Sequence, residues 1–346
     1  MEKADRIAYL DHLRIFATFA VIILHVSGIS WESADVNGFE WQVYNIFNSA
    51  VRWCVPVFVM ISGSLFLGRD VPVKTIYSKY ILRLAVAFVV WSVIYGLYSG
   101  ALFTDKVSSL IHGHYHMWFV LMIAGLYMCL PIIKPIAQNK NRSGYFLVLA
   151  LVFGFIIPQA VTLANDFGGN LITTVANALE DDLSAMQLHM ILGYTSYFIL
   201  GYSLSKAELS KKQRTVIYLL GLAGFISTVL LTSAIALKTQ TASEHYYGYF
   251  NVNVLLEAAA VFVWFKYRRY DKVKHPVLIQ NLSKYSFGAY LVHILIISLL
   301  TVQLGLNTAS LHPVLIVLCL SAAVFAASYA VSAVLNHIPI VKKYMV

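Results

Sequence analysis

The chain is patterned as a series of long apolar segments separated by short polar connections. A hydrocarbon core about 30 Å thick is crossed by about twenty helical residues, because an α-helix rises about 1.5 Å per residue. Segments of this length occur at residues 8–29, 43–67, 80–103, 117–137, 145–164, 189–205, 215–237, 250–267, 285–305 and 312–335. Inside lipid, one segment satisfies its own backbone hydrogen bonds only as a helix. The pattern therefore predicts an all-α fold, a polytopic membrane helix bundle of about ten transmembrane helices.

The composition is that of a membrane protein without an appended soluble domain. Of the 346 residues, 59% are hydrophobic and 12% are charged, and the mean hydropathy is +0.72. We expect residues 1–346 to form a single integral-membrane domain. The first apolar segment carries Asp11, Arg14 and His25 and lacks a small-residue cleavage site, so we expect it to stay in the mature protein. The longest non-membrane piece is an expected outer loop near 165–188, either a lid or a solvated connection.

Basic and acidic residues alternate between successive connections. The basic connections contain Lys3, Arg6, Arg69, Lys74, Lys79, Lys134, Lys140, Arg142, Lys206, Lys211, Lys212, Arg214, Lys266, Arg268, Arg269, Lys272, Lys274, Lys284, Lys342 and Lys343. The others contain Glu32, Asp35, Glu40, Asp105, Asp166, Glu180, Asp181, Asp182 and Glu244, with Lys106 and Lys238. By the positive-inside rule, both termini and the basic connections are cytoplasmic. The net charge of +9 then reflects topology and contact with anionic lipids, not nucleic acid binding.

Arg14 and His25 are the most informative residues, because ionisable side chains inside a membrane segment are costly and usually functional. They are eleven positions apart in the first apolar segment. On a helix this spacing places them on nearly the same face, about 16 Å apart along the membrane normal. One of them can therefore hold an anionic group near one membrane surface while the other acts near the opposite surface.

The cytoplasmic half of the membrane contains Arg14 together with Lys79 and Arg83 at the start of the third span. Guanidinium groups grip phosphate in a bidentate manner, so these residues form a candidate anion site. The alternative is structural: the side chains reach lipid phosphates, or Arg14 pairs with Asp11 one turn earlier. We favour the structural alternative for Lys79 and the functional one for Arg14.

The outer half contains His25, Arg52 in the second span and Glu257 in the eighth. Because they lie at comparable depth, we expect them to line one cavity in which a carboxylate orients the imidazole as a base. The alternative is that Arg52 and Glu257 form a buried ion pair that only closes the bundle.

Other histidines lie near the outer end or within a span. His112, His114 and His116 alternate before Trp118, but no carboxylate or cysteine completes a ligand set, so we expect no metal site. We expect His116 to line the outer mouth of the cavity and Trp118 to anchor the interface. His293 lies within a span one turn from Tyr290, and a substrate contact and a satisfied core pair are equally consistent with that position. The scattered Cys54, Cys129 and Cys319 are predicted to be packing residues.

The second span contains Pro56 and the run Ser62-Gly63-Ser64. The proline predicts a kink, and the small residues permit a close approach of another helix. Packing therefore explains this span without any chemistry.

Several of these motifs together resemble the integral-membrane type-3 acyltransferases, the acyltransferase 3 family. They are the run Asp11-His12-Leu13-Arg14 leading to His25, the run from Val55 to Gly63, His116-Met117-Trp118-Phe119, and Gly288-Ala289-Tyr290-Leu291-Val292-His293. The arginine and histidine separated by ten residues are the most specific of these marks. The chain is most similar to the short, single-domain branch that includes the enterobacterial common antigen O-acetyltransferase.

The resemblance implies that an acyl group passes from cytoplasmic acyl-CoA to a hydroxyl of a cell-envelope glycan or lipid-linked sugar. It makes His25 the catalytic base and Arg14 its partner at the CoA, with Arg83, Ser62, His116 and His293 as matches of lesser weight. Glu257 has no counterpart in the resemblance, and its expected catalytic role rests on depth and charge alone.

The expected protein is thus a multi-pass O-acyltransferase of the inner, cytoplasmic membrane that uses acetyl-CoA as the default donor. His25 takes the hydroxyl proton of the acceptor, and Arg52 or a backbone N–H stabilises the oxyanion. In a less favoured variant, His25 itself takes the acetyl group first. The chief alternative is a transporter or exporter of a small polar molecule, because ionisable residues within the membrane also mark transport pathways. A structural or sensor protein is the third possibility.

Overall fold

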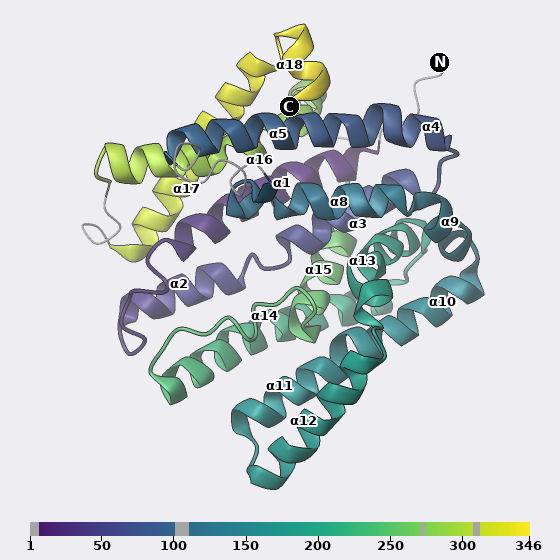
Figure 1. Cartoon of the computed structure of the whole chain (residues 1–346), viewed down its shortest axis with the longest axis vertical. Helices are drawn as coiled ribbons and strands as arrows, with labels where there is room; N and C mark the ends of the chain where they lie inside the picture. Colours follow the sequence, from purple (N-terminus) through teal and green to yellow (C-terminus); the bar gives the residue numbers. More distant parts are fainter. Residues whose placement is uncertain (1–6, 101–110, 271–273, 307–311) are drawn as a thin grey trace.

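The structure is a computed structural model that describes residues 7–100, 111–270, 274–306 and 312–346. Every regular element in these ranges is helical (Figure 1). The α-helices are α1 (Ala8–Gly28), α2 (Phe39–Ser49), α3 (Cys54–Phe66), α4 (Val73–Thr75), α5 (Leu82–Tyr98), α8 (Trp118–Met128), α9 (Leu130–Gln138), α10 (Lys140–Leu149), α11 (Ile157–Phe167), α12 (Asn170–Ala185), α13 (His189–Lys206), α14 (Lys211–Thr239), α15 (Val252–Lys266), α16 (Pro276–Ser298), α17 (Pro313–Leu335) and α18 (Pro339–Tyr344). Short π-helical or 3₁₀ turns are η1 (Ile76–Ile81), η2 (Tyr115–Met117), η3 (Ala150–Ile156) and η4 (Leu299–Gln303).

The all-α prediction is confirmed, and the chain is a multi-pass membrane protein. Within the described residues, seven stretches are long and apolar enough to cross a membrane: Ala8–Gly28, Phe39–Phe66, Val73–Tyr98, Lys140–Phe167, Lys211–Thr239, Pro276–Gln303 and Pro313–Leu335. An eighth arises if α8 and α9, which are bent by 68° at their junction, form one span. Helices α13 and α15 occupy the sixth and eighth predicted segments but do not meet the same criteria. The count of about ten stays a prediction.

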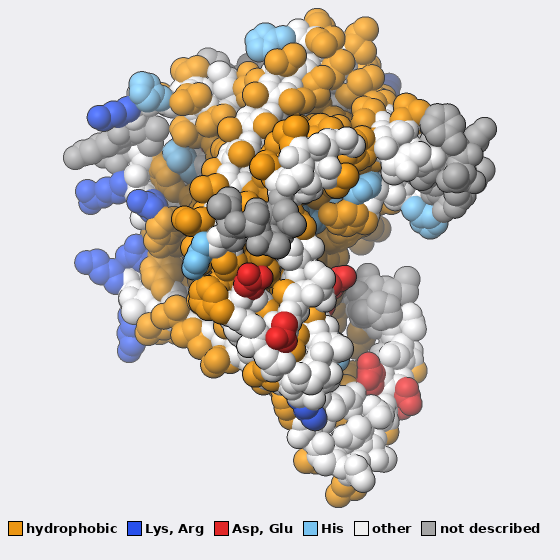
Figure 2. Space-filling view, turned by 90° about the vertical axis from the view of Figure 1, so that its left-hand side faces the viewer, with side chains coloured by type: hydrophobic (Ala, Val, Ile, Leu, Met, Phe, Trp, Pro, Cys, Tyr) orange, Lys and Arg blue, Asp and Glu red, His pale blue; other side chains and the backbone are white. Residues whose placement is uncertain are grey.

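The orientation with both termini in the cytoplasm also stays a prediction. Figure 2 shows most of the visible Lys and Arg side chains along its left margin, whereas the visible Asp and Glu side chains lie toward its centre and lower right. Hydrophobic side chains cover much of the surface between them. Five of the charged residues behind the prediction lie outside the described residues: Lys3, Arg6, Asp105, Lys106 and Lys272.

The expected outer loop near 165–188 contains a helix, α12, which packs against α11 (Figure 1). Its apolar residues Leu171, Val175 and Leu179 recur every four positions, the spacing that places side chains on one helical face. These three side chains are exposed. The acidic run alone suggested a loop, but the apolar repeat before it favours a helix.

Glycine residues allow α3 and α13 to cross in direct backbone contact. A Cβ atom added at Gly63 would lie 1.9 Å from the backbone oxygen of Phe198, and one at Gly201 would lie 2.2 Å from that of Met60. Ser64 strengthens the crossing by donating a hydrogen bond to the Gly201 carbonyl at 2.9 Å. Small residues serve this purpose in membrane bundles because lipid tails provide little hydrophobic drive for helix association.

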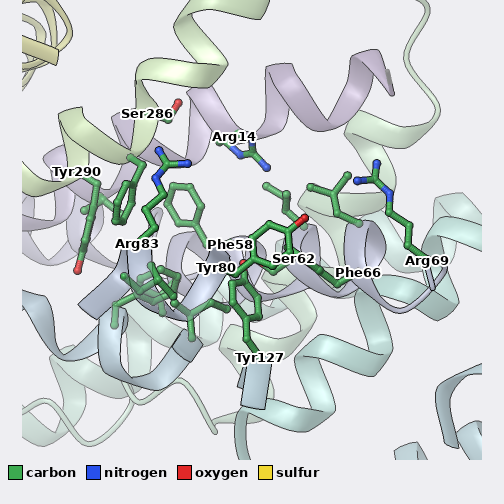
Figure 3. Close-up of a pocket in the computed structure, with 18 residues that line it drawn as sticks. Arg14, Phe58, Ser62, Phe66, Arg69, Tyr80, Arg83, Tyr127, Ser286 and Tyr290 are labelled. Carbon is green, nitrogen blue, oxygen red and sulfur yellow. The ribbon is translucent and has the colours of Figure 1, made fainter. Parts of the chain in front are cut away.

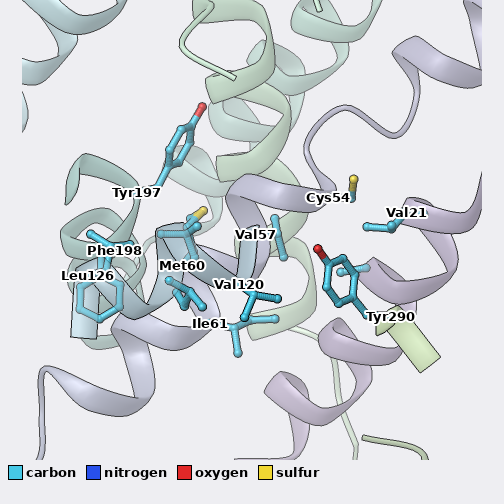
Figure 4. Close-up of a cluster of buried hydrophobic side chains, with 14 of the residues drawn as sticks. Val21, Cys54, Val57, Met60, Ile61, Val120, Leu126, Tyr197, Phe198 and Tyr290 are labelled. Atoms are coloured by element: carbon cyan, nitrogen blue, oxygen red, sulfur yellow. The ribbon is translucent and has the colours of Figure 1, made fainter. Parts of the chain in front are cut away.

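The buried core extends from this crossing to α1 and α16. Figure 4 shows side chains of α1, α3, α8, α13 and α16 meeting in the cluster, among them Val21, Val57, Met60 and Val120. The Tyr290 hydroxyl lies within this apolar cluster (Figure 4). The core therefore fixes the relative positions of the helices that carry the predicted chemistry.

We predict that Gly63→Ala lowers the stability of the protein by about 1–3 kcal/mol, because the added methyl group forces two helix backbones apart. Gly125→Ala is the matched control, since a Cβ atom there meets nothing within 4 Å. Thermal unfolding in detergent measures both variants. Equal unfolding midpoints for the two variants would show that the α3–α13 crossing does not depend on the glycine.

The predicted orientation can be tested by labelling at Asp181, which lies on α12 and is exposed. In a variant in which Cys54, Cys129 and Cys319 are replaced by alanine, we expect Asp181→Cys to react with a membrane-impermeant maleimide on intact cells. The control Lys212→Cys, in a basic connection, should react only after lysis. The reverse pattern would invert the topology.

Candidate functional site

Helices α1 and α16 lie side by side and carry the predicted site residues as two facing stripes. On α1 the stripe is Arg14, Thr18, Val21 and His25, and on α16 it is Ser283, Ser286, Tyr290 and His293. Both stripes recur every three or four residues, so each covers one helical face. Arg14 Nη1 lies 3.4 Å from Ser283 Oγ, and the rings of His25 and His293 have centroids 5.1 Å apart. Because both stripes start at the same end, the two helices run parallel.

A cavity of about 350 Å³ lies beside the α1–α16 pair (Figure 3). Its wall is mainly aliphatic and aromatic, with three arginines. The lining residues are Arg14, Val21, Val55, Phe58, Ile61, Ser62, Leu65, Phe66, Arg69, Tyr80, Arg83, Leu84, Phe119, Ile123, Tyr127, Ser286, Phe287 and Tyr290. Such a cavity suits a ligand with a long apolar or amide portion and an anionic portion.

The arginines differ in position along the cavity. Figure 3 shows Arg14 and Arg83 close together near Ser286, whereas Arg69 lies at the opposite end from Tyr290. Arg83 also donates a hydrogen bond to the backbone carbonyl of Val346, so part of its donor capacity is used within the protein. Three guanidinium groups along one wall form a strongly positive surface for phosphate or carboxylate.

Of the other two residues predicted to bind the acyl donor, Ser62 lines the cavity and Lys79 does not. Ser62 lines the cavity on α3. Lys79, on η1, is exposed and is not part of the wall, and its Nζ lies 5.6 Å from the Tyr80 ring centroid. Arg69 was missed as a site residue because a cation just beyond a predicted span usually reaches the lipid interface.

At the mouth beside Arg69, Lys134 donates a hydrogen bond to the Asp70 carboxylate. This bond and the positive charge lower the pKa of Asp70 below its usual value. The Asp70 side chain is fully exposed, so the pair contributes little to stability. The Asp70 carboxylate nevertheless places a negative charge beside the basic residue Arg69.

At the other end, the cavity reaches Val21 and Tyr290, each about one helical turn before a histidine of the facing stripes. Here His25 and His293 are joined by His116 and His114 from the segment before α8. The ring centroids are 5.3 Å apart for His116 and His293, and 5.1 Å apart for His114 and His116. We call these four residues the histidine cluster. The sequence predicted three of its members separately but not their meeting.

Hydrogen bonds fix much of the histidine cluster. The His293 Nδ1–H donates to the Tyr290 carbonyl at 2.5 Å, and the Tyr290 hydroxyl donates to the His116 carbonyl. The Nδ1 atoms of His114 and His116 lie 2.9 Å apart, so one of them donates to the other. His116 and His293 are almost fully buried, and within the described residues the Nε2 atom of each has no hydrogen-bond partner. Burial lowers the pKa of His114 below its usual value.

Arg52 and Glu257 do not meet in the structure as the sequence suggested. The Arg52 guanidinium lies 3.9 Å from the Tyr247 ring centroid and 3.8 Å from Glu244 Oε1. Glu257 accepts a hydrogen bond from the Thr228 hydroxyl at 2.8 Å. Glu257 also lines a separate groove beside Phe16, away from the walls of the main cavity. Its expected catalytic role stays a prediction.

Trp118 lies in an aromatic group at the start of α8. Its ring stacks on that of Tyr249 with centroids 5.8 Å apart, and Tyr194 lies at the same centroid distance. Trp118 is 37% exposed, so the group offers an aromatic surface to a ligand as well as an interfacial anchor. Within the described part of the chain, no three His, Cys, Asp or Glu side chains are grouped so as to hold a metal ion.

A family model described as an acyltransferase domain matches residues 7–333. This region contains every residue of the main cavity and all four members of the histidine cluster. Comparisons with curated proteins and with solved structures returned no match.

Proposed function

Because the chain belongs to the acyltransferase 3 family and is a membrane acyltransferase, we propose that it transfers an acyl group, by default acetyl, from cytoplasmic acyl-CoA to a hydroxyl on the outer side. The acceptor is a cell-envelope glycan or lipid-linked sugar, and the protein resides in the inner membrane. The observation that carries this proposal is the cavity that begins among arginines and ends one turn from His25.

The cavity has the chemical character that an extended acyl-CoA requires. Arg14, Arg69 and Arg83 provide charge for its phosphates, and the apolar wall from Phe58 to Tyr290 surrounds the flexible arm. The rise of about 16 Å between Arg14 and His25 is of the same order as an extended pantetheine arm. The thioester thus approaches the histidine cluster while the nucleotide end stays at the cytoplasmic side.

His25 is the proposed general base. It is partly buried on α1, and its Nδ1 lies 3.4 Å from the Tyr115 hydroxyl, so its imidazole is within reach of an outer ligand. His25 takes the proton of the acceptor hydroxyl as the oxygen attacks the thioester carbonyl. When the carbon–sulfur bond breaks, the imidazolium returns the proton to the leaving thiolate. Trp118 provides a ring surface on which a sugar acceptor can stack.

We expect purified protein to release CoA from acetyl-CoA when a polyhydroxyl acceptor is present, and His25→Ala to reduce this turnover about 10²- to 10⁴-fold. Free thiol, measured with a chromogenic disulfide, reports the reaction. His12→Ala is the control, because His12 lies on the same helix, where its Nδ1–H donates to the Ala8 carbonyl and its ring lies against that of Tyr270. Substrate uptake into vesicles without thioester consumption would instead favour the transporter alternative.

Arg14→Ala should raise the KM for acetyl-CoA about 10- to 100-fold, which is the size of a lost hydrogen bond to a charged group. The KM for the acceptor should change little, because the acceptor enters from the other side. Steady-state kinetics with each substrate varied in turn separates the two effects. Arg142→Ala, an exposed cation on α10, is the matched control. Equal effects on both KM values would contradict donor binding at Arg14.

A further inference from the structure

His293 is fully buried, and one of its two ring nitrogens has no hydrogen-bond partner among the described residues. Its side chain has no solvent exposure, and its Nδ1–H donates to the Tyr290 carbonyl one turn earlier on α16. This bond leaves the lone pair on Nε2, because neutral imidazole carries one proton. In the part of the chain that the structure describes, no group donates a hydrogen bond to this Nε2 atom. A buried acceptor of this kind is costly unless another group donates to it.

Two histidine rings adjoin His293, and the ring of His25 is the nearer one. His116 lies edge-on to it at 89° with a centroid distance of 5.3 Å; its Nδ1 is engaged with His114, and its Nε2 is buried without a partner among the described residues. His25 lies with its ring centroid 5.1 Å from that of His293 and at an angle of 46°. The Nδ1 atom of His25 faces the Tyr115 hydroxyl on the side of the incoming acceptor. The opposite nitrogen, Nε2, is not used in that contact, and within the described residues it forms no hydrogen bond with His293 in this structure.

We propose that His293 is the positioning residue for His25: its Nε2 accepts the Nε2–H of His25 and leaves the lone pair of His25 on Nδ1. This inference rests on the proposed role of His25 as base. The Tyr115 hydroxyl, 3.4 Å from Nδ1, marks the position of the acceptor hydroxyl. Tyr115 is 63% exposed, so its side chain can leave when an acceptor arrives.

The chemistry explains why an imidazole suits this position. When Nδ1 of His25 takes the acceptor proton, the imidazole ring becomes positively charged. The hydrogen bond from its Nε2–H to the neutral His293 ring stabilises this charge. The acceptor oxygen then bonds to the thioester carbon, the carbon–sulfur bond breaks, and the proton passes from Nδ1 to sulfur. An orienting group holds a catalytic histidine in the correct tautomer throughout such a cycle. A neutral orienting group does so without placing a permanent charge inside the membrane.

The kinetic test compares His293→Leu, which removes the acceptor, with His293→Gln, whose side-chain oxygen can replace Nε2. We expect the leucine variant to lose about a hundredfold in kcat, the lower range for a positioned acid–base group. The KM values for acetyl-CoA and for the acceptor should stay within about threefold, because neither substrate touches His293. The glutamine variant should recover about tenfold, the worth of one restored hydrogen bond.

Equal losses in both variants, an effect confined to KM, or an unchanged kcat in the leucine variant would each overturn the inference. If His25→Ala abolishes turnover while His293→Leu does not, the inference fails and the proposed function stands. If the leucine variant does not fold, as judged by thermal unfolding, the glutamine variant is compared with His293→Asn, whose shorter side chain cannot reach the same point.

A second measurement does not depend on turnover. Solid-state NMR of the protein labelled with ¹⁵N at its eleven histidines reports which ring nitrogen carries the proton. The His25 signal is assigned from its loss in His25→Ala. We expect the Nε2–H tautomer of His25 in the native protein and a shift toward Nδ1–H in His293→Gln or His293→Leu. An Nδ1–H tautomer of His25 in the native protein would overturn the inference even if the transferase activity is found.

Discussion

The parallel contact between α1 and α16 is the constraint on which the rest of the site depends. The step of eleven residues from Arg14 to His25 is matched by ten residues from Ser283 to His293 on the facing helix. One contact therefore sets both ends of the reaction path. Since the helices are rigid over this length, a cation at one end and an imidazole at the other keep a fixed separation without any loop between them.

Close helix packing is what makes this contact reliable inside a membrane. The α16–α17 contact includes Gly288, where an added Cβ would lie 2.4 Å from the Ser332 hydroxyl, and α14 meets α15 in the same way at Gly221. Small side chains of the neighbouring helix pack directly against these glycines, so the helices have little freedom to rotate about their axes. Rotation of α16 would carry His293 away from His25 and Tyr290 away from the cavity. Packing far from the chemistry thus controls the geometry of the base.

The predictions from the sequence agree with the structure where they concern the geometry of a single helix. The helical period alone put Arg14 and His25 on one face, and apolar length alone located the main helical segments. Arg52 and Glu257 were grouped with His25 because their depth in the membrane was similar. Similar depth alone does not bring side chains together, however. The direction in which each side chain faces depends on the rotation of its helix, which tertiary packing sets. Glu257 consequently lines a groove separate from the cavity beside α1 and α16, and it accepts a hydrogen bond from Thr228.

The same limit explains why the histidine cluster could not be foreseen. Its members come from α1, from the segment before α8 and from α16, so nothing in their spacing signals that they meet. The orphaned Nε2 of His293 is visible only once the hydrogen bond of its Nδ1 to Tyr290 is known. Arg69 was hidden for a related reason, because a basic residue at a span end carries a topological signal whether or not it lines a cavity.

The combination of arginines and apolar side chains along the cavity gives a physical reason for transferring the acyl group rather than moving the whole donor. Carrying several phosphate charges through the hydrocarbon layer would be very costly, whereas a neutral thioester on a flexible arm crosses apolar surroundings easily. The arginines hold the charges where water can reach them, and the wall from Phe58 to Tyr290 keeps the thioester from bulk water. The base is then needed only where an outer hydroxyl meets the end of that arm. Of the residues in the two facing stripes, His25 is the one that combines this position with partial exposure.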